Sequence, residues 1–427
     1  MDNRLDTALP PGNRGSLNNC ILIVLIYLLV FQNPLERISS IFKFTDELFA
    51  LAAVPILVIS SVKRGRLKIK HYIGIAVIPL TVFVVTGLWG NVLYQYQPWK
   101  LVLTDLFTNL KFFLTLMSGY ALAPLCMNRS ASRLVSTHLR LICVLIFALF
   151  CVERITPVFG MTEVRYGLRT AQMIFGHATY LAGAMAFLIA ALTVFYEKKN
   201  LPFIAIALLM LMFTLRSKAI VSAMVYVLLF LFIIVIKGKL KLWHIAVLGA
   251  AAVVIGWQQI SFYFIELGGG SARSVMTMTS FEIMADYFPI GTGFGTYASH
   301  VAGTHYSPVY VQYGFEEVYE LSSTTGMFFD DTFWPIIIGQ TGFIGTLAYL
   351  ALLSLIFSKV FYLKKVNNYW FVAGLFILIY TLISSTAEPA FNNAVSIPLA
   401  VILGGLIRLV EYHRYADSCK STSIFFQ

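Results

Sequence analysis

Residues 219–236 read AIVSAMVYVLLFLFIIVI, a stretch without a single charged residue. Its apolar side chains cover every face of a helix, as in a segment surrounded by lipid or by protein core. About twenty such residues are enough to cross the hydrocarbon of a bilayer, whereas the strands of a membrane β-barrel alternate apolar and polar positions. The stretch therefore predicts a membrane-spanning helix.

The rest of the chain has the same character. Of its 427 residues, 59% are apolar and 12% are charged, whereas soluble proteins are about half apolar and about a quarter charged. These values exclude soluble enzymes and nucleic-acid-binding proteins and predict an all-α polytopic membrane protein with about twelve spans. The predicted spans cover residues 20–33, 41–61, 72–92, 101–125, 141–159, 173–196, 201–215, 219–236, 243–264, 332–357, 370–387 and 393–411.

The distribution of positive charge predicts the orientation of these spans. The chain has 31 Lys and Arg against 20 Asp and Glu, and 21 of the 31 fall in one set of alternate loops. Positive loops stay in the cytoplasm, so both termini are expected there. The resulting division is a cytoplasmic tail at 1–19, spans within 20–264 with a short external loop at 154–172, a large external (periplasmic) loop at 265–331, spans within 332–411 and a cytoplasmic tail at 412–427.

Cysteine usage and the N-terminus add two expectations. The five cysteines show no CxxC or Cys/His spacing, so neither a disulfide framework nor a metal site is indicated, and we predict no cofactor. The first nineteen residues are polar and include Pro10-Pro11-Gly12. The first apolar stretch is therefore expected to be a retained span rather than a cleaved signal.

Several external cations resist the positive-inside bias, and five of them lie near the membrane surface: Arg165, Arg169, Arg216, Lys218 and Arg273. Arginine presents a planar fork of donors that suits phosphate, so the set predicts a site for a lipid pyrophosphate. Arg216-Ser217-Lys218 is expected to be a tight turn between two spans. The alternative is that these cations pair with Glu153, Glu163 or lipid headgroups, or only extend towards the membrane surface.

The large external segment is long for a loop, and such loops are usually functional or disordered. Its aromatic content and low net charge argue against disorder. Its aromatic and His residues include Tyr287, Tyr297, Tyr306, Tyr310, Tyr313, Tyr319, His300 and His305. Elsewhere, Asp46, Glu47 and Asp105 lie near the outer ends of predicted spans, where they are candidate partners for Lys43 or Lys111.

The large external segment ends with an acidic pair, Asp330-Asp331. A carboxylate at a low-dielectric boundary can act as a base, and we assign that role to Asp331, with Asp330 as its neighbour. The alternative is that the pair caps the next helix. In the same segment, Gly291-Thr292-Gly293-Phe294-Gly295 lacks the G-x-G-x-x-G spacing of a nucleotide loop. It predicts a turn whose backbone closely approaches a neighbour or ligand.

The order of these motifs resembles the O-antigen polymerase and O-antigen ligase superfamily. That family carries an Arg, a P-x-G-x-G turn, an acid or His, and a Q/E-x-G-x-x-G helix. The corresponding residues here are Arg273, Pro289–Gly293, Asp331 and Gln340–Gly345. Residues 215–219 also resemble the family's short Ser-Arg turn, and 174–178 its G-x-F-x-H segment, which contains His177. The Ser-Arg turn differs here, because Arg216 and Lys218 both compete for the role of its cation.

The resemblance implies a metal-independent glycosyltransferase with a GT-C-like fold in the bacterial inner membrane. It would move a growing glycan from undecaprenyl pyrophosphate onto the next lipid-linked repeat unit, making O-antigen, capsule or exopolysaccharide. Asp331 and Arg273 would be catalytic. The implied binding residues are Arg165, Arg169, Arg216, Lys218, His177, Tyr297, His300 and Asp330. A flippase and a chain-length regulator are the protein partners that the resemblance implies.

Two other functions stay open on the sequence alone. A ligase of the same superfamily would have a His where this chain has Asp330-Asp331. A transporter or flippase for lipid-linked oligosaccharides would place its charges near the middle of the bilayer, whereas most of the unexplained charges here lie at one surface. This asymmetry favours an enzyme.

Overall fold

The computed structural model describes residues 16–52, 71–126, 129–156, 158–160, 163–238, 261, 271–324, 329 and 331–424. Asp330, the predicted span 243–264 apart from residue 261, and the second half of the predicted span 41–61 lie outside the described residues.

The prediction of an all-α protein is confirmed within the described residues. The α-helices are α2 (Ser16–Ile38), α3 (Thr45–Leu51), α5 (His71–Tyr94), α6 (Trp99–Leu122), α7 (Arg129–Ile155), α8 (Ala178–Val194), α9 (Leu201–Phe213), α10 (Ser217–Phe230), α12 (Ala272–Asp286), α13 (His300–Thr304), α14 (Pro308–Gln312), α15 (Trp334–Val366), α16 (Asn368–Ser384) and α17 (Ile397–Ile424). A π-helical stretch, Leu231–Val235, extends α10. The only described strands, β1 (Val164–Arg165) and β2 (Leu168–Arg169), form one hairpin.

Seven of these helices are long and apolar enough to cross a membrane, and α8 and α16 are shorter apolar helices. These helices indicate a multi-pass membrane protein. The seven spans are Asn19–Ile38, Ile75–Tyr94, Trp99–Leu125, Ser130–Ile155, Ser217–Val235, Trp334–Val366 and Ala394–His413. The finer prediction of twelve spans stays a prediction.

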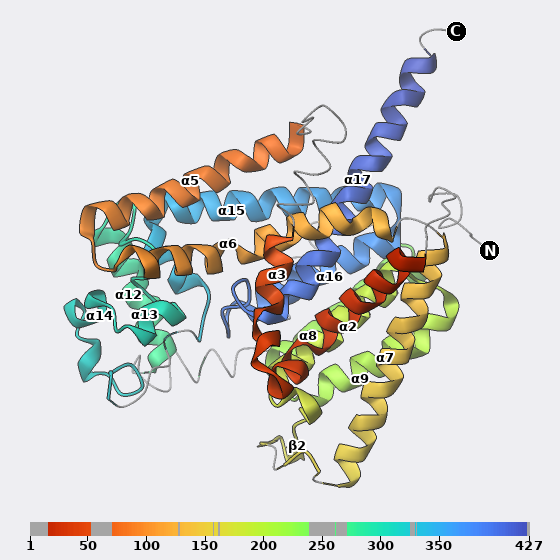
Figure 1. Cartoon of the computed structure of the whole chain (residues 1–427), viewed down its shortest axis with the longest axis horizontal. Coiled ribbons are helices and arrows are strands. Elements are labelled where there is room, and N and C mark those ends of the chain that lie inside the picture. Colours follow the sequence, from red (N-terminus) through yellow and green to blue (C-terminus); the bar gives the residue numbers. More distant parts are fainter. Residues whose placement is uncertain are drawn as a thin grey trace.

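Two groups of helices form the molecule (Figure 1). In one group, α5 packs along α15, and α12 packs on α15 near the end of the molecule that carries α13 and α14. In the other group, α8 packs against α7 and α9. Helix α17 packs along α6 and also contacts α8 and α15, so it joins the two groups.

The segment predicted as a large external loop is folded where the structure describes it. It contains α12, α13 and α14, and its aromatic side chains supply a small core. Tyr310 stacks on Phe329 with ring centroids 4.3 Å apart, and both are buried. The aromatic content of the sequence argued against disorder, and the packed rings give the physical reason.

The glycine-rich turn fixes this segment to α15. Thr292 N–H donates to the Gly339 carbonyl at 3.1 Å, and Gly293 N–H donates to the Gln340 carbonyl at 2.8 Å. These bonds require the backbones to touch, and α15 meets the turn at Gly342, where φ is +58° and the helix is broken. The predicted close approach is confirmed, and the neighbour is another helix.

Polar side chains of the spans hold the same turn from the other side. The Asn91 side chain accepts from Phe294 N–H at 2.8 Å and donates to the Phe294 carbonyl at 2.9 Å. Asp105, completely buried in α6, accepts from Gly295 N–H at 2.9 Å. Of the candidate partners for Lys111, the structure places Asp46 at 2.7 Å and Glu47 at 3.7 Å from its Nζ, whereas Asp105 bonds the turn.

We predict that Gly291→Ala destabilises the protein much more than Gly314→Ala. Both glycines have positive φ, +74° and +70°, so each variant carries the cost of a left-handed alanine, about 1–2 kcal/mol. Only at Gly291 would the new Cβ meet backbone, 2.5 Å from Gly342 N, whereas nothing lies within 4 Å at Gly314. Thermal unfolding of the purified protein in detergent checks this. Equal melting temperatures for the two variants would contradict the docking of the turn.

Candidate functional site

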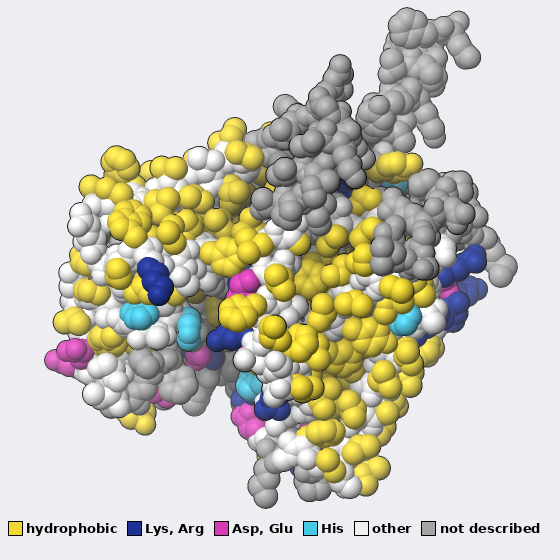
Figure 2. All heavy atoms as spheres, in the orientation of Figure 1, with side chains coloured by type: hydrophobic (Ala, Val, Ile, Leu, Met, Phe, Trp, Pro, Cys, Tyr) yellow, Lys and Arg dark blue, Asp and Glu magenta, His cyan; other side chains and the backbone are white. Residues whose placement is uncertain are grey.

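Four of the five predicted surface cations form one electrostatically coupled group. They are Arg165, Arg216, Lys218 and Arg273, and each pairs with a carboxylate of Glu163, Glu388 or Asp331. We call these seven residues the outer charge cluster. Figure 2 shows charged and His side chains gathered around the recess between the part that carries α12–α14 and the part that carries α2 and α7–α9. The cations outnumber the carboxylates by one.

Arg216 lies at the centre of this cluster, as the residue that precedes α10. Its Nη2 donates to Glu163 at 3.2 Å and lies 3.3 Å from Nε2 of His177. Partial burial lowers the pKa of Arg216, and the positive charge of Arg165 lowers it further. Its Nε is buried and donates to no acceptor among the described residues. The guanidinium therefore has a spare donor.

His177 presents a second spare donor at the same place. Its side chain caps α8, where Nδ1 accepts the Thr179 N–H at 3.2 Å. Partial burial lowers the pKa of His177, followed by the positive charges of Arg216 and Lys218, so the ring is neutral at pH 7. A neutral imidazole whose Nδ1 accepts carries its proton on Nε2. Two donors, Nε2–H of His177 and Nη2 of Arg216, thus face each other, which favours an anion that accepts from both.

Lys218 forms the most buried pair of the cluster. The structure corrects the expected three-residue turn, because α10 begins at Ser217 and Lys218 lies in its first helical turn. Its Nζ lies 2.7 Å from Oε1 of Glu388, and both side chains are only 9% exposed. Glu388 comes from the link between α16 and α17. Breaking such a pair would leave a charge with little access to water.

Arg273 and Asp331 form the third pair. Arg273 is the second residue of α12, and its Nε and Nη2 donate to Oδ2 of Asp331 at 3.2 and 3.1 Å. The Asp331 side chain is 40% exposed, and its other oxygen accepts no hydrogen bond from any described residue. The second oxygen can therefore accept a proton or hydrogen bond from a molecule in solution.

The β-hairpin separates the two arginines that the sequence analysis grouped together. Arg165 pairs across the hairpin with Leu168, and Val164 with Arg169. Cross-strand partners share a face and neighbouring positions alternate, so Arg165 and Arg169 point to opposite faces. Arg165 lies 2.8 Å from Glu163 in the cluster.

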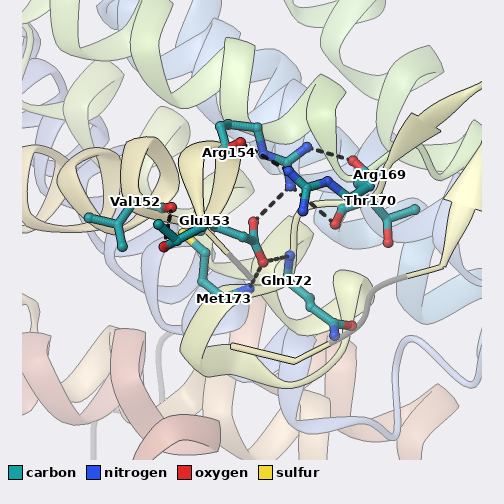
Figure 3. A network of polar contacts seen from close by, with 8 residues as sticks. Val152, Glu153, Arg154, Arg169, Thr170, Gln172 and Met173 are labelled. Atoms are coloured by element: carbon teal, nitrogen blue, oxygen red, sulfur yellow. Dashed lines mark hydrogen bonds and ion pairs between the residues drawn. The ribbon is translucent and has the colours of Figure 1, made fainter. Parts of the chain in front are cut away.

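Arg169 belongs to a different network, at the end of α7 (Figure 3). It donates to the carbonyl of Arg154 at 2.9 Å, and Arg154 donates back to the Arg169 carbonyl. Buried Glu153 pairs with Arg154 at 3.0 Å and accepts from Met173 N–H at 2.7 Å. Among the described residues, Glu153 pairs with Arg154 rather than with Arg169, and the network ties α7 to the segment before α8. The alternative of pairing with Glu163 holds for Arg165 and Arg216.

The remaining predicted site residues lie as follows. Tyr297 is completely buried, and its hydroxyl donates to the Met276 carbonyl at 2.7 Å, so it supports the fold and cannot touch a ligand in this conformation. His300 is exposed at the start of α13. Asp330 lies outside the described residues. Within the described part of the chain, no three His, Cys, Asp or Glu residues are placed to hold a metal.

Sequence reasoning missed Glu388. Its signal in the sequence was a lone carboxylate in a short polar link between two apolar stretches. Only the three-dimensional structure shows that this link reaches Lys218.

The comparisons leave the family open. No protein-family model matches this chain, and no curated protein matches it.

We predict that Glu388→Gln lowers stability by about 3–5 kcal/mol, because it leaves Lys218 charged and buried without its partner. Glu163→Gln is the matched control, since Glu163 is 50% exposed and an exposed pair contributes less than about 1 kcal/mol. Thermal unfolding in detergent measures both.

Millimolar inorganic pyrophosphate should raise the melting temperature of Glu388→Gln more than that of the wild type. Equal responses would contradict an anion site at Lys218.

We also predict a loss of stability as the pH falls from 7.5 to 5. The folded-state pKa of His177 lies below its usual value near 6.5, so the unfolded chain takes up the proton first. The contribution of the neutral His177 to stability is therefore complete above the unfolded-state pKa, and it is lost as the pH falls towards the folded-state pKa. His177→Asn keeps a capping side chain without this titration. Its melting temperature should fall less over the same range, and an identical fall in both proteins would contradict the assignment.

Proposed function

We propose that this protein is a metal-independent glycosyltransferase that joins lipid-linked oligosaccharide repeat units into a surface polysaccharide. Its donor would be an oligosaccharide on undecaprenyl pyrophosphate, and its acceptor a sugar hydroxyl of the next repeat unit. We place it in the bacterial cytoplasmic membrane with twelve spans, both termini in the cytoplasm and the outer charge cluster on the external face. The order of its sequence motifs supports the family, and the cluster supports the chemistry.

One observation carries the proposal. Arg216 and His177 direct donors at each other without an acceptor between them, and Arg216 has a further buried donor with no described acceptor. Buried donors without acceptors are rare in proteins. A pyrophosphate would satisfy these donors, because it offers several charged oxygens to guanidinium and imidazole groups. Lys218 and Arg273 act electrostatically on the same region.

The reaction assigns a task to each part of the cluster. The acceptor hydroxyl oxygen attacks the anomeric carbon of the donor, and the bond from that carbon to the pyrophosphate oxygen breaks. The electron pair of this bond leaves with the pyrophosphate, whose added charge Arg216, Lys218 and Arg273 stabilise. The acceptor proton goes to a base, for which Asp331 is suited because its side chain is 40% exposed and one of its oxygens accepts no hydrogen bond from a described residue.

Charge placement also favours this proposal over a transporter. The four cations of the cluster flank the helix starts of α10 and α12 and the link before α8. Helix starts and links are expected near a membrane surface, whereas transporters place substrate sites near the middle of the bilayer.

We predict that Arg273→Ala and Asp331→Ala each abolish polymer in a host from which the gene is deleted. Removing one group that stabilises charge in the transition state typically costs about 10²–10³ in rate, and removing a general base about 10²–10⁴. The surface glycan is run on a gel, where the wild type should restore a ladder and the variants only a single repeat unit. Arg169→Ala is the matched arginine control and should restore the ladder.

Other outcomes of this experiment would contradict the proposal in different ways. A full ladder from both variants would remove Arg273 and Asp331 from the reaction. Polymer that accumulates on its lipid carrier in the deletion strain would indicate a ligase. Repeat units that stay on the cytoplasmic side would indicate a flippase.

A further inference from the structure

A group of tyrosines lies at the opposite end of α12 from the outer charge cluster. They come from the end of α5, the link to α6, the end of α12 and the end of α14, which Figure 1 shows at one end of the molecule. We call the group, with two polar neighbours, the tyrosine surface. Its members are Tyr94, Tyr96, Tyr287, Tyr313, Gln312 and Asp286.

The polar network of the tyrosine surface consists of two separate hydrogen-bonded sets. The hydroxyls of Tyr96 and Tyr287 lie 2.7 Å apart, and Tyr287 donates to Gln312 Oε1 at 3.0 Å. Gln312 Nε2 in turn donates to the Tyr96 hydroxyl at 3.2 Å. Tyr313 donates to Asp286 at 2.6 Å. Gln312 and Asp286 are exposed and the four tyrosines are partly exposed, so the network can exchange bonds with a ligand in water.

The rings themselves provide flat apolar contact area. Tyr94 and Tyr96 are nearly parallel, with centroids 5.9 Å apart, and Tyr287 meets Tyr94 edge-on at 4.8 Å. Tyrosine combines rigid contact area with a polar tip and costs little conformational entropy on binding. Rings beside amide and carboxylate groups match a sugar, which has apolar C–H faces and a rim of hydroxyls.

The elements that carry this network are also joined by other contacts. The α5 helix is already joined to the glycine-rich turn by the two buried hydrogen bonds between Asn91 and Phe294. Buried Tyr297 and Tyr310 supply the core of the external segment. Of the aromatics that sequence analysis grouped in this segment, Tyr287 and Tyr313 are thus joined to exposed polar groups at its surface.

We propose that the tyrosine surface binds a hydroxyl-rich oligosaccharide, as a second glycan site separate from the outer charge cluster. This inference rests on the proposed function for its ligand, the glycan being extended. Arg273 and Tyr287 bracket α12, and fourteen residues of helix rise about 21 Å. The surface would therefore hold sugars several units away from the bond being made.

Binding of free oligosaccharides to the full-length protein in detergent tests the proposal. The probes are oligosaccharides of one to six repeat units, released from the host's surface glycan and measured by isothermal titration. The wild type should bind long probes more tightly than a single unit. Tyr96→Ala/Tyr287→Ala should weaken the longest probe at least tenfold and remove the dependence on length.

Three controls keep the result decisive. Tyr319→Ala removes a tyrosine of the same segment that is 75% exposed and outside the network, and it should bind as the wild type does. Tyr96→Phe/Tyr287→Phe keeps the ring packing and should show a smaller loss, which guards against misfolding of the alanine variant. Arg273→Ala should lose polymer formation but retain binding of the probes.

Two results would overturn the proposal: a wild type that binds no probe, or a double alanine variant that binds like the wild type. Failure of the proposed function has a different signature, because Arg273→Ala would then leave the glycan ladder intact whatever the probes show.

Discussion

The segment that carries α12, α13 and α14 depends on a contact between two backbones, at Gly291 and Gly342. No side chain fits between them, since a Cβ on Gly291 would lie 2.5 Å from Gly342 N. The contact fixes the turn after α12 to the break in α15, so α12 must lie along α15. Asp331 precedes α15 and Arg273 begins α12. Their meeting at 3.1 Å is therefore a consequence of how two helices are joined elsewhere.

The charged pairs of the molecule differ in what surrounds them. Lys111 and Asp46 are both buried, and the second oxygen of Asp46 accepts from Gln32 at 3.1 Å. That pair is largely satisfied within the protein and serves the packing of α3 on α6. In the outer charge cluster, Glu163 is half exposed and Arg216 retains an unused donor. Carboxylates in such places act as replaceable partners, because water or an incoming anion can take over their role at modest cost.

Much of the fold could be predicted from hydropathy, because a lipid-facing helix must be apolar along its whole length. The cations predicted to be external were found by a related argument, since charge that opposes the positive-inside bias needs a reason. Their partners could not be found this way. Arg165 and Arg169 point to opposite faces because of the register in which β1 pairs with β2. Glu388 has its role because the link between α16 and α17 reaches Lys218 in α10. Tyr297 looked like its neighbours in sequence, and only packing shows that it is buried.

Helix α12 connects the two proposed sites, and its stiffness holds them at a fixed distance from each other. A flexible link would let the sites drift apart, but an α-helix fixes the distance between its ends. An oligosaccharide bound at Tyr287 therefore has its reacting end held at a set number of sugars from Arg273. Binding energy gained at the tyrosine surface would then contribute to positioning the anomeric carbon of the growing glycan. A chain too short to reach both sites would lose that contribution, so extension would favour chains that already span α12.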